Sequence, residues 1–591
     1  RRRALLMAET RAPGYDLDAQ AAGQAAIATA IADVRTDPAI RLVVTGPSVF
    51  AVESRATIRD DVWWLTLTAG IGVTLLLLAA YRRISLVAFG LLSVASGISV
   101  GIASVSVGFG IVHGITLGFG AALVGEAVDY PTFLVAHHAA GERLSATAAR
   151  IWPTLRLAML TTVFGSLAML LSSFVGLAQL GLFSLAGVLT AGLVTRYVIP
   201  ALATTRPSER IAPLARAAPA LSALCGHARI LAPLVPAAFV AAAVVITLDY
   251  ATLWENDLAN LSPVPEAAKA RDQELRNALG APDVRHIIAV RGKSVEDVLQ
   301  RFERLEPALH RLADSGAIRA YDTPARYLPS IATQRARQAA LPEAGELAGR
   351  LARATLGLPF RDDLFKPFLE DVERARTAPP VTPADLANTA WGLAIRSLLV
   401  EQKGGWVGLA PLSGVAEPGV PAAAMAALGD PAILALDLKA ESDSMVRTYR
   451  DQALVLAFLG VAAIAAVLML GLRSMRRVTA VMIPVLAAIA ATAAIFVLAG
   501  VRLSLLHIVS LLLVLGIGVN YALFFNRSTR DAADRIWSTY SVMVANVTTL
   551  IAFGALATSG TSILQAIGQT VVLGAALSLA FSAAWARPGV E

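Results

Sequence analysis

Apolar runs of about twenty residues alternate with short polar segments along most of the chain. An α-helix needs about 20 apolar residues to cross a hydrocarbon core of about 30 Å. We therefore expect a polytopic α-helical membrane protein, with eleven spans visible in this chain. The predicted spans are residues 62–81, 84–107, 113–137, 153–173, 177–203, 229–248, 449–472, 478–499, 503–526, 538–559 and 563–586.

The charges support this prediction and give the spans an orientation. The chain has 591 residues, of which 56% are hydrophobic and 16% are charged, whereas a soluble protein carries about 25% charged residues. The net charge of +7 does not indicate nucleic-acid binding, because the arginines concentrate in short loops on one side of the spans. Cytoplasmic loops are enriched in such residues, so the long polar stretch is expected outside. These arginines are Arg82, Arg83, Arg143, Arg150, Arg206, Arg210, Arg216, Arg473, Arg476, Arg477, Arg527, Arg530 and Arg535.

The grouping of the spans divides the chain into two unequal halves. Five spans are followed by a lone span, a long polar stretch and five more spans. Residues 205–228 between the halves are either an amphipathic helix on the inner membrane surface or a plain linker. The predicted segments are a remnant of a first outer domain (1–58), a five-helix bundle (59–204), the cytoplasmic linker (205–228), the lone span (229–248), an outer α+β domain (249–448), a second five-helix bundle (449–586) and a cytoplasmic tail (587–591).

The outer domain shows both strand and helix patterns. Apolar and β-branched residues predict strands at 285–290, 406–409 and 432–438, and apolar residues at helical spacing predict a helix over 294–314. An α+β sandwich of βαβ-type units follows from this order. The stretch 340–385 is expected to be helical or irregular.

A sequence repeat relates the two bundles. The segment Gly125–Tyr130 (GEAVDY) returns 391 positions later as Gly516–Tyr521 (GIGVNY). The pairs Thr161-Thr162 and Thr548-Thr549 also recur, followed by Gly181 and Gly568, and Asp37-Pro38-Ala39-Ile40 returns as Asp430-Pro431-Ala432-Ile433. The lone span has no counterpart in the first half. We therefore expect twelve spans in the full protein, and we interpret this chain, which starts without a methionine, as a fragment or a processed form.

Asp129 is the first candidate for chemistry. An ionised aspartate at the centre of a membrane helix costs about 2.5–3.5 kcal/mol on insertion scales. Glu126 lies three residues earlier on the same helical face, with Tyr130 beside it. Burial disfavours the charged form of a carboxyl group, and a second carboxylate disfavours it further, so the pair could take up and release protons. Thr161 and Thr162 on the next helix could complete a hydrogen-bond relay. The alternative is that Asp129 and the threonines only hold helices together.

The second copy of the motif differs in its chemistry. Asn520 has the shape of aspartate but cannot ionise, and Tyr521, Thr548 and Thr549 are the remaining counterparts of the first-half candidates. A helix–helix amide contact is the expected role of Asn520. The two halves are therefore not chemically equivalent.

Other signals for enzymes, metals or cofactors are absent from the sequence. It contains no Gly-x4-Gly-Lys-Ser/Thr phosphate loop and no His-Glu-x-x-His. His137 and His138 fall at the inner end of a predicted span, where interfacial solvation accounts for them. A single cysteine, Cys225, excludes an internal disulfide. We expect no enzymatic activity, no metal and no cofactor.

Several of these features together resemble the RND superfamily, specifically the MMPL-type predicted exporters of bacteria. They are the Asp-Tyr motif ending at Tyr130, its repeat ending at Tyr521, the one-plus-five grouping of spans and the segment Trp254–Pro263 (WENDLANLSP). The resemblance implies a duplicated RND-like bundle with a periplasmic porter-like domain, in the bacterial inner membrane. It implies export of a lipid or polyene-like molecule driven by the proton-motive force, with Asp129 and Tyr130 in the proton relay. A xanthomonadin-type exporter is the nearest named possibility.

The same resemblance leaves alternatives open. Relatives often carry an acidic residue at both repeat positions, so Asn520 is a departure that puts in doubt any relay through both halves. RND-like scaffolds also serve in sterol sensing and protein secretion, which makes a lipid-binding protein that does not pump the second hypothesis. The implied partners are a hydrophobic substrate, protons and membrane lipids, and a homo-oligomer stays open.

Overall fold

The chain forms two compact units in the computed structural model, residues Arg1–Lys269 with Met445–Glu591 and residues Ala270–Ser444. Each unit is described by itself. The structure describes residues 10, 12–14, 16–34, 43–81, 84–114, 116–118, 126–138, 142–203, 218–250, 252–257, 264, 266–279, 285–361, 363–527 and 532–586. The linker arginines before residue 217, the repeat at Asp37–Ile40 and most of the Trp254–Pro263 segment lie outside these residues.

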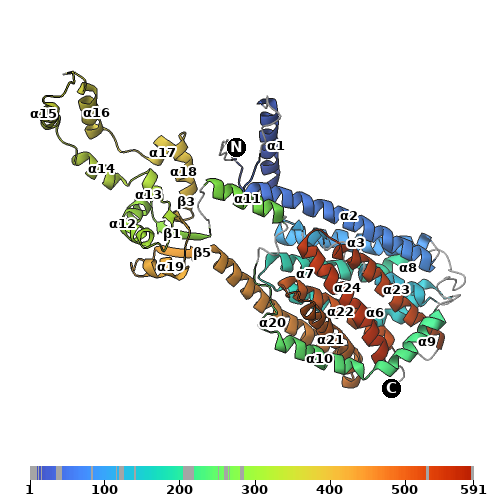
Figure 1. The fold of residues 1–591 in the computed structure, drawn as a ribbon. Helices are drawn as coiled ribbons and strands as arrows, with labels where there is room; N and C mark the ends of the chain where they lie inside the picture. The colour runs from blue at the N-terminus through green and yellow to red at the C-terminus, as the bar shows by residue number, and fades with distance from the viewer. Residues whose placement is uncertain are drawn as a thin grey trace. The chain divides into compact units, whose positions relative to one another are not determined.

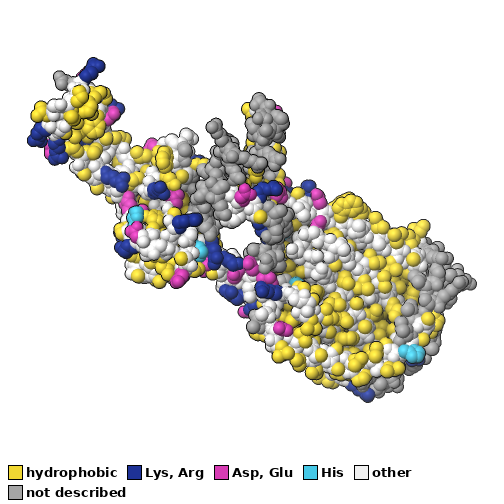
Figure 2. Space-filling model, viewed as in Figure 1, with side chains coloured by type: hydrophobic (Ala, Val, Ile, Leu, Met, Phe, Trp, Pro, Cys, Tyr) yellow, Lys and Arg dark blue, Asp and Glu magenta, His cyan; other side chains and the backbone are white. Residues whose placement is uncertain are grey.

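The first unit is a bundle of long apolar helices (Figure 1). Among the described residues, nine helices are long and apolar enough to cross a membrane, and a bent pair, Cys225–Leu231 with Leu234–Leu248, makes a tenth. Hydrophobic side chains cover the visible face of this bundle (Figure 2). The long helices are α2 (Pro47–Tyr81), α3 (Ile84–Phe109), α6 (Leu144–Leu170), α7 (Val175–Leu193), α20 (Leu438–Leu472), α21 (Met475–Leu498), α22 (Leu505–Phe525), α23 (Ala532–Ala557) and α24 (Ser562–Trp585).

Shorter elements complete the bundle. Helix α7 continues through a π-helical turn, η1 (Val194–Val198), into α8 (Ile199–Leu202). The lone predicted span is α10 (Leu234–Leu248), which is bent by 53° from the helix before it. Pro233 lies at this break, and proline removes a helical hydrogen bond and clashes with the preceding turn. The other short elements are α1 (Leu17–Val34), α9 (Ala218–Ala228) and η3 (Arg229–Leu231).

The bounds of some predicted spans differ from those of the helices. Helices α2, α6 and α20 begin well before the predicted residues 62, 153 and 449. Hydropathy marks where a helix enters an apolar environment, whereas the backbone helix continues through polar turns on either side. Of the predicted span 113–137, residues 119–125 lie outside the described part, and helix α5 (Asp129–Ala136) covers its end.

The two halves of the bundle have matching helices. Helices α2 and α20 are both 35 residues long, and their bounds differ by 391 at each end (438 − 47 and 472 − 81). The halves are packed in a crossed arrangement, because α5 of the first half packs on α23 of the second, and α6 of the first half packs on α22. A single buried core contains residues of both halves. Nearly all of α22 is buried within it.

Glycines allow a close helix crossing at equivalent places in each half. A Cβ atom at Gly181 of α7 would overlap the backbone of Leu170 at the end of α6. A Cβ atom at Gly568 of α24 would overlap the backbone of Leu556 and Ala557 at the end of α23. The recurrence of these glycines in the sequence therefore has a packing cause.

The second unit is built on an antiparallel sheet with the strand order β2-β4-β1-β5, and β3 pairs with β4. Helix α12 (Val295–Asp314) connects β1 to β2, and α19 (Gly419–Ala426) connects β4 to β5. In each case one strand lies between the two that the helix joins, which makes two split βαβ units and confirms the expected α+β architecture. The strands are β1 (His286–Gly292), β2 (Ala320–Tyr321), β3 (Leu399–Gln402), β4 (Gly405–Ser413) and β5 (Ile433–Asp437).

The core of this unit lies between the sheet and α12. Ile288 and Val290 of β1 are fully buried with Phe302 and Leu309 of α12. The predicted strands and the predicted helix 294–314 are confirmed. The stretch 340–385, left undecided by the sequence, is mostly helical. The remaining helices are α11 (Glu266–Leu279), α13 (Pro324–Tyr327), α14 (Ile331–Ala339), α15 (Ala344–Thr355), α16 (Lys366–Thr377), α17 (Pro383–Leu386) and α18 (Ala390–Leu398).

An ion pair at the end of β5 predicts a pH-dependent stability. Arg285 donates to both carboxylate oxygens of Asp437, at 3.1 and 3.2 Å, and this lowers the pKa of Asp437 to about 2. Because the unfolded chain has an ordinary carboxyl pKa near 4, the contribution is present above about pH 4 and is lost as the pH falls toward 2. Asp437→Asn is expected to lower the free energy of unfolding at pH 7 by up to about 2 kcal/mol.

Denaturant unfolding of the full chain in detergent measures this effect. The difference between the parent chain and Asp437→Asn should shrink from pH 5 to pH 3. The exposed Asp314, changed to asparagine, is the control and should alter little at either pH. A difference that stays constant with pH would contradict the assignment.

Candidate functional site

The candidate residues are buried inside the helical bundle. Asp129 begins α5, and Glu126 lies just before that helix. Asp129 is 1% exposed and Glu126 is 2% exposed. The seven other residues singled out in the sequence are also buried, and they are Tyr130, Thr161, Thr162, Asn520, Tyr521, Thr548 and Thr549.

The hydrogen bond to Asp129 comes from the opposite half of the bundle. The Thr548 hydroxyl on α23 lies 3.4 Å from Asp129 Oδ1. It also lies 2.6 Å from the Ala545 carbonyl oxygen of its own helix. A hydroxyl has one proton to donate, so these two acceptors compete for it. The Thr548 hydroxyl can therefore bond either to Asp129 of the first repeat or to the Ala545 carbonyl of its own helix.

The two threonines of the first repeat bond within their own helix, and one of them lies next to the neighbours of Asp129. Thr161 and Thr162 donate to the Ala158 carbonyl of their own helix, at 2.7 and 3.4 Å. Thr162 lies close to Glu126 and Tyr130. Helix α5 packs on both α23 and α6, so its polar side chains meet helices of both repeats. The hydroxyl that bonds Asp129 thus belongs to Thr548 of the second repeat.

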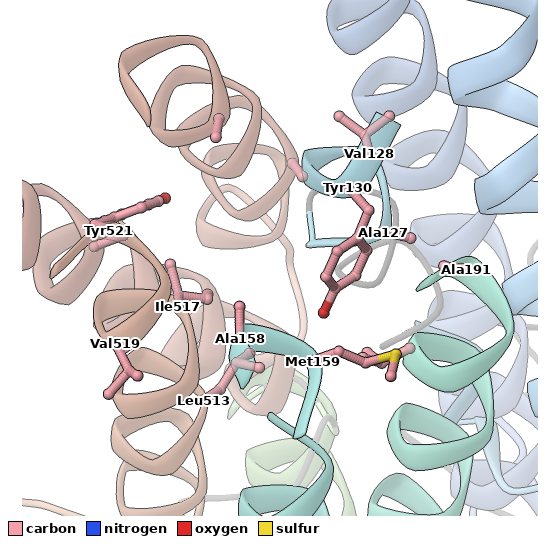
Figure 3. Packing of buried hydrophobic residues seen from close by; sticks show 14 of the residues in the cluster. Ala127, Val128, Tyr130, Ala158, Met159, Ala191, Leu513, Ile517, Val519 and Tyr521 are labelled. Carbon is pink, nitrogen blue, oxygen red and sulfur yellow. The ribbon is translucent and has the colours of Figure 1, made fainter. Parts of the chain in front are cut away.

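Tyr130 points from α5 toward α6, with its hydroxyl directed at the region of Ala158 and Met159 (Figure 3). Within the described part of the chain, its hydroxyl has no hydrogen-bond partner. The same holds for Glu126 Oε1, Asp129 Oδ2 and Asn520 Oδ1. Leaving a buried polar atom without a partner costs about 1–3 kcal/mol, and more if the group is charged. A buried carboxyl group is less costly when it is protonated and neutral than when it is charged, so these surroundings are suited to proton uptake by Asp129 or Glu126.

The second repeat offers hydrogen bonds without a carboxyl group. The Tyr521 hydroxyl donates to Thr549 Oγ1 at 3.3 Å, and Thr549 donates to the Ala545 carbonyl at 3.0 Å. Asn520 occupies the position of Asp129 and is 2% exposed. An amide cannot take up a proton near neutral pH. The ionisable chemistry of this region therefore lies in the first repeat.

Two phenylalanines mark where the repeats meet. Phe133 of α5 and Phe524 of α22 are stacked, with ring centroids 3.8 Å apart and planes inclined by 15°. Their numbers differ by the repeat offset (524 − 133 = 391). Equivalent residues of the two repeats thus contact each other, one helical turn from Asp129 and Asn520.

His137 occupies a different environment from the one expected. It is 2% exposed, and its Nε2 lies 2.9 Å from Ser538 Oγ on α23. Its Nδ1 lies 2.9 Å from the Phe133 carbonyl oxygen. His138 is also buried and lies 3.0 Å from Thr147. Interfacial solvation therefore does not account for these histidines, because helix α6 and helix α23 cover them.

Sequence reasoning did not identify His137, Ser538 or Asp61 as polar contacts between the repeats. Asp61 accepts hydrogen bonds from Ser559 and Thr561 of the second repeat. A lone histidine and an aspartate beside charged neighbours carry no distinguishing pattern. Among the described residues, no group of three or more His, Cys, Asp or Glu side chains is arranged to hold a metal ion.

The comparisons with known proteins concern both the family and the fold. Residues 9–223 match the MMPL family. The fold is similar to that of SecDF, a translocon-associated membrane protein from Thermus thermophilus, with a TM-score of 0.51 and 13% identity over 90% of this chain. It is also similar to the hedgehog release protein Disp from the water bear Hypsibius dujardini, with a TM-score of 0.52 and 13% identity over 90% of this chain. A heavy metal efflux pump gives a TM-score of 0.52 and 11% identity over 96% of this chain.

The matches differ in how much of each relative is covered. This chain covers 62% of SecDF, 70% of Disp and 71% of the efflux pump. It therefore spans less than two thirds of the SecDF chain. At identities of 11–13% the likeness concerns the fold alone. A search of curated protein sequences gives no match.

Proposed function

We propose that this chain, whose residues 9–223 match the MMPL family, is a secondary exporter that uses the proton-motive force to move a lipid or another hydrophobic molecule. Asp129 is the carboxyl group that takes up and releases the proton. The proposed location is the bacterial inner membrane, with the α+β unit on the periplasmic side. Membrane lipids and a hydrophobic substrate are the proposed partners, and no cofactor takes part.

The observation that carries this proposal is the shared Thr548 hydroxyl. It can donate to Ala545 within its own helix or to Asp129 across the repeats. A carboxylate attracts a donor more strongly than a neutral carbonyl does. We infer that ionised Asp129 draws the hydroxyl toward itself, whereas protonated Asp129 releases it to Ala545. Each proton taken up would then remove a bond between the repeats.

The energies involved are of comparable size. A charge that crosses the membrane gains about 2.3 kcal/mol per 100 mV. A hydrogen bond to a charged group contributes about 1.5–3 kcal/mol. Proton entry can therefore bias a rearrangement of α23 against α5 without a nucleotide. Because Asn520 replaces the second carboxyl group, we propose that the chain has one proton site, which lies in the first repeat.

Proton flux in reconstituted vesicles tests the proposal. The full chain is reconstituted with a total bacterial lipid extract, which supplies candidate substrates, around an internal pH-sensitive dye. An imposed pH gradient should drive a proton flux that depends on the protein, several-fold above that of empty vesicles. Imposing an equal salt gradient without a pH difference is the control. Flux equal to that of empty vesicles under both conditions would overturn the proposal.

A second candidate function is lipid binding without pumping, for example in sensing or in assembly of secreted proteins. The loss of the second carboxyl group at Asn520 is the observation that favours it. This alternative predicts that lipids copurify with the chain but that the pH gradient drives no flux. Mass spectrometry of copurified lipids together with the flux measurement separates the two.

A further inference from the structure

A second carboxyl group connects the repeats near one end of the bundle. Asp61 of α2 accepts hydrogen bonds from Ser559 Oγ at 2.7 Å and from Thr561 Oγ1 at 3.0 Å. Both donors are buried, at 6% and 2% exposure, in the turn between α23 and α24. Thr561 is the N-cap residue of α24, so the carboxylate lies at the positive end of a 24-residue helix. Charge and hydrogen bonding therefore act together at Asp61.

The opposite repeat has the same connection without the charge. Gln452 of α20 is the counterpart of Asp61 (452 − 61 = 391). Its Oε1 accepts hydrogen bonds from the backbone N–H of Ser173, at 3.2 Å, and from the Ser173 hydroxyl. Ser173 lies in the turn between α6 and α7, immediately before the N-cap of α7. The connection belongs to the architecture of both repeats, and the carboxylate is particular to the first.

Helix α23 and the turn after it contact two carboxyl groups of the first repeat. Thr548 on α23 faces Asp129, and Ser559 just past its end faces Asp61. The two positions are eleven residues apart in sequence, which corresponds to about 16 Å of helix. An α-helix of this length moves as a nearly rigid element. A displacement of α23 at Thr548 therefore also displaces Ser559.

We propose that Asp61 is the positioning residue through which α23 moves α2 during transport. The inference rests on the proposed function, because it assumes that the state of Asp129 displaces α23. The charge of Asp61 keeps α2 attached to the α23–α24 turn throughout that displacement. Gln452, with neutral bonds, holds α20 less firmly. The first repeat thus has a carboxyl group at both contacts, Asp61 and Asp129, where the second repeat has the neutral Gln452 and Asn520.

Flux measurements on variants of the full chain in the same lipid-extract vesicles test this role. Asp61→Ala should lower the maximal proton flux about tenfold, the expected effect of losing a charge-assisted bond. Asp61→Asn keeps the acceptor oxygen and should lower it about threefold. Asp61→Glu restores the charge and should recover most of the flux. Gln452→Ala is the matched control in the opposite repeat and should change the flux less than twofold.

A variant cycle separates coupling from general damage. Ser559→Ala with Thr561→Val should reduce the flux as much as Asp61→Ala, and combining all three should cause no further loss. The dependence of flux on the size of the pH gradient should keep its midpoint, since Asp61 does not bind the transported proton. Unaltered flux in Asp61→Ala, or losses that multiply in the combined variant, would overturn the proposal.

The outcome also distinguishes this inference from the proposed function. If Asp129→Asn is inactive while Asp61→Ala and Asp61→Asn transport normally, the role of Asp61 is rejected and the proton site stands. If Asp129→Asn transports normally, both are rejected. If Asp61→Ala fails to reach the membrane, the role of Asp61 is tested with Asp61→Asn instead, because asparagine has the same shape as aspartate.

Discussion

Replacing Asp129 with asparagine is expected to abolish gradient-driven proton flux, by about a hundredfold or more, while the chain stays folded in the membrane. The amide has the shape of the carboxyl group but cannot take up a proton near neutral pH. It also cannot become an anion, so the Thr548 hydroxyl stays with the Ala545 carbonyl, 2.6 Å away. The measurement is proton flux in vesicles, with thermal unfolding in detergent beside it. The unfolding temperature should be equal or higher, because a buried ionisable group is costly.

Variants of Thr548 and Asn520 in the second repeat extend this test. Thr548→Val removes the hydroxyl at nearly constant volume and should lower the flux about tenfold, the size of a charge-assisted bond. A carboxyl group at position 520 should not be required for flux, since Asn520 is not part of the proposed proton site, so neither Asn520→Asp nor Asn520→Ala should abolish it. Normal flux in Asp129→Asn would contradict the role of Asp129. A full loss in Asn520→Ala would show that the second repeat takes a larger part than proposed.

Adding one methyl group at Gly568 is expected to destabilise the bundle by about 3 kcal/mol. A Cβ atom there would overlap backbone atoms of Leu556 and Ala557. Backbone cannot move aside as a flexible side chain does, so α24 would have to shift away from α23. Overpacking of a filled core costs about 1–3 kcal/mol, and occasionally more. Denaturation of Gly568→Ala in mixed micelles, compared with the parent chain, measures the change.

Gly554 provides the matched control on the neighbouring helix. A Cβ atom at Gly554 of α23 would meet nothing within 4 Å. Alanine is favoured over glycine in a helix by about 0.5–1 kcal/mol, so Gly554→Ala should be neutral or slightly stabilising. Equal destabilisation by the two substitutions would show that the close crossing is not the cause.

The membrane helices could be predicted from the sequence because their signal is local. An apolar run long enough to cross a bilayer has few alternatives, since backbone polar groups in lipid must be satisfied within the segment. The repeat offset of 391 residues could also be predicted, because the motif ending at Tyr130 returns at Tyr521. The bounds of α2 and α20 differ by the same offset at both ends. The strand pattern of β1 and the amphipathic pattern of α12 predicted the core of the α+β unit for the same reason.

The partners of the buried polar residues could not be predicted in this way. The sequence places Asp129 and Thr161 in one repeat, and their proximity was the natural expectation. The bond from Thr548 depends on how the repeats cross, and that arrangement is set by many weak packing contacts distant in sequence. The burial of His137 by Ser538 and the contact of Asp61 with Ser559 have the same origin.

The stacked rings of Phe133 and Phe524 have a consequence for the ancestry of the chain. Where two identical subunits form an isologous dimer, a residue on the two-fold axis meets its own equivalent. The two repeats meet here as two copies in a homodimer would. Before duplication and fusion, a half-length ancestor would have dimerised through this same phenylalanine and would have carried two identical polar centres. Fusion then allowed Asp129 and Asn520 to diverge, which no symmetric homodimer encoded by a single sequence can do.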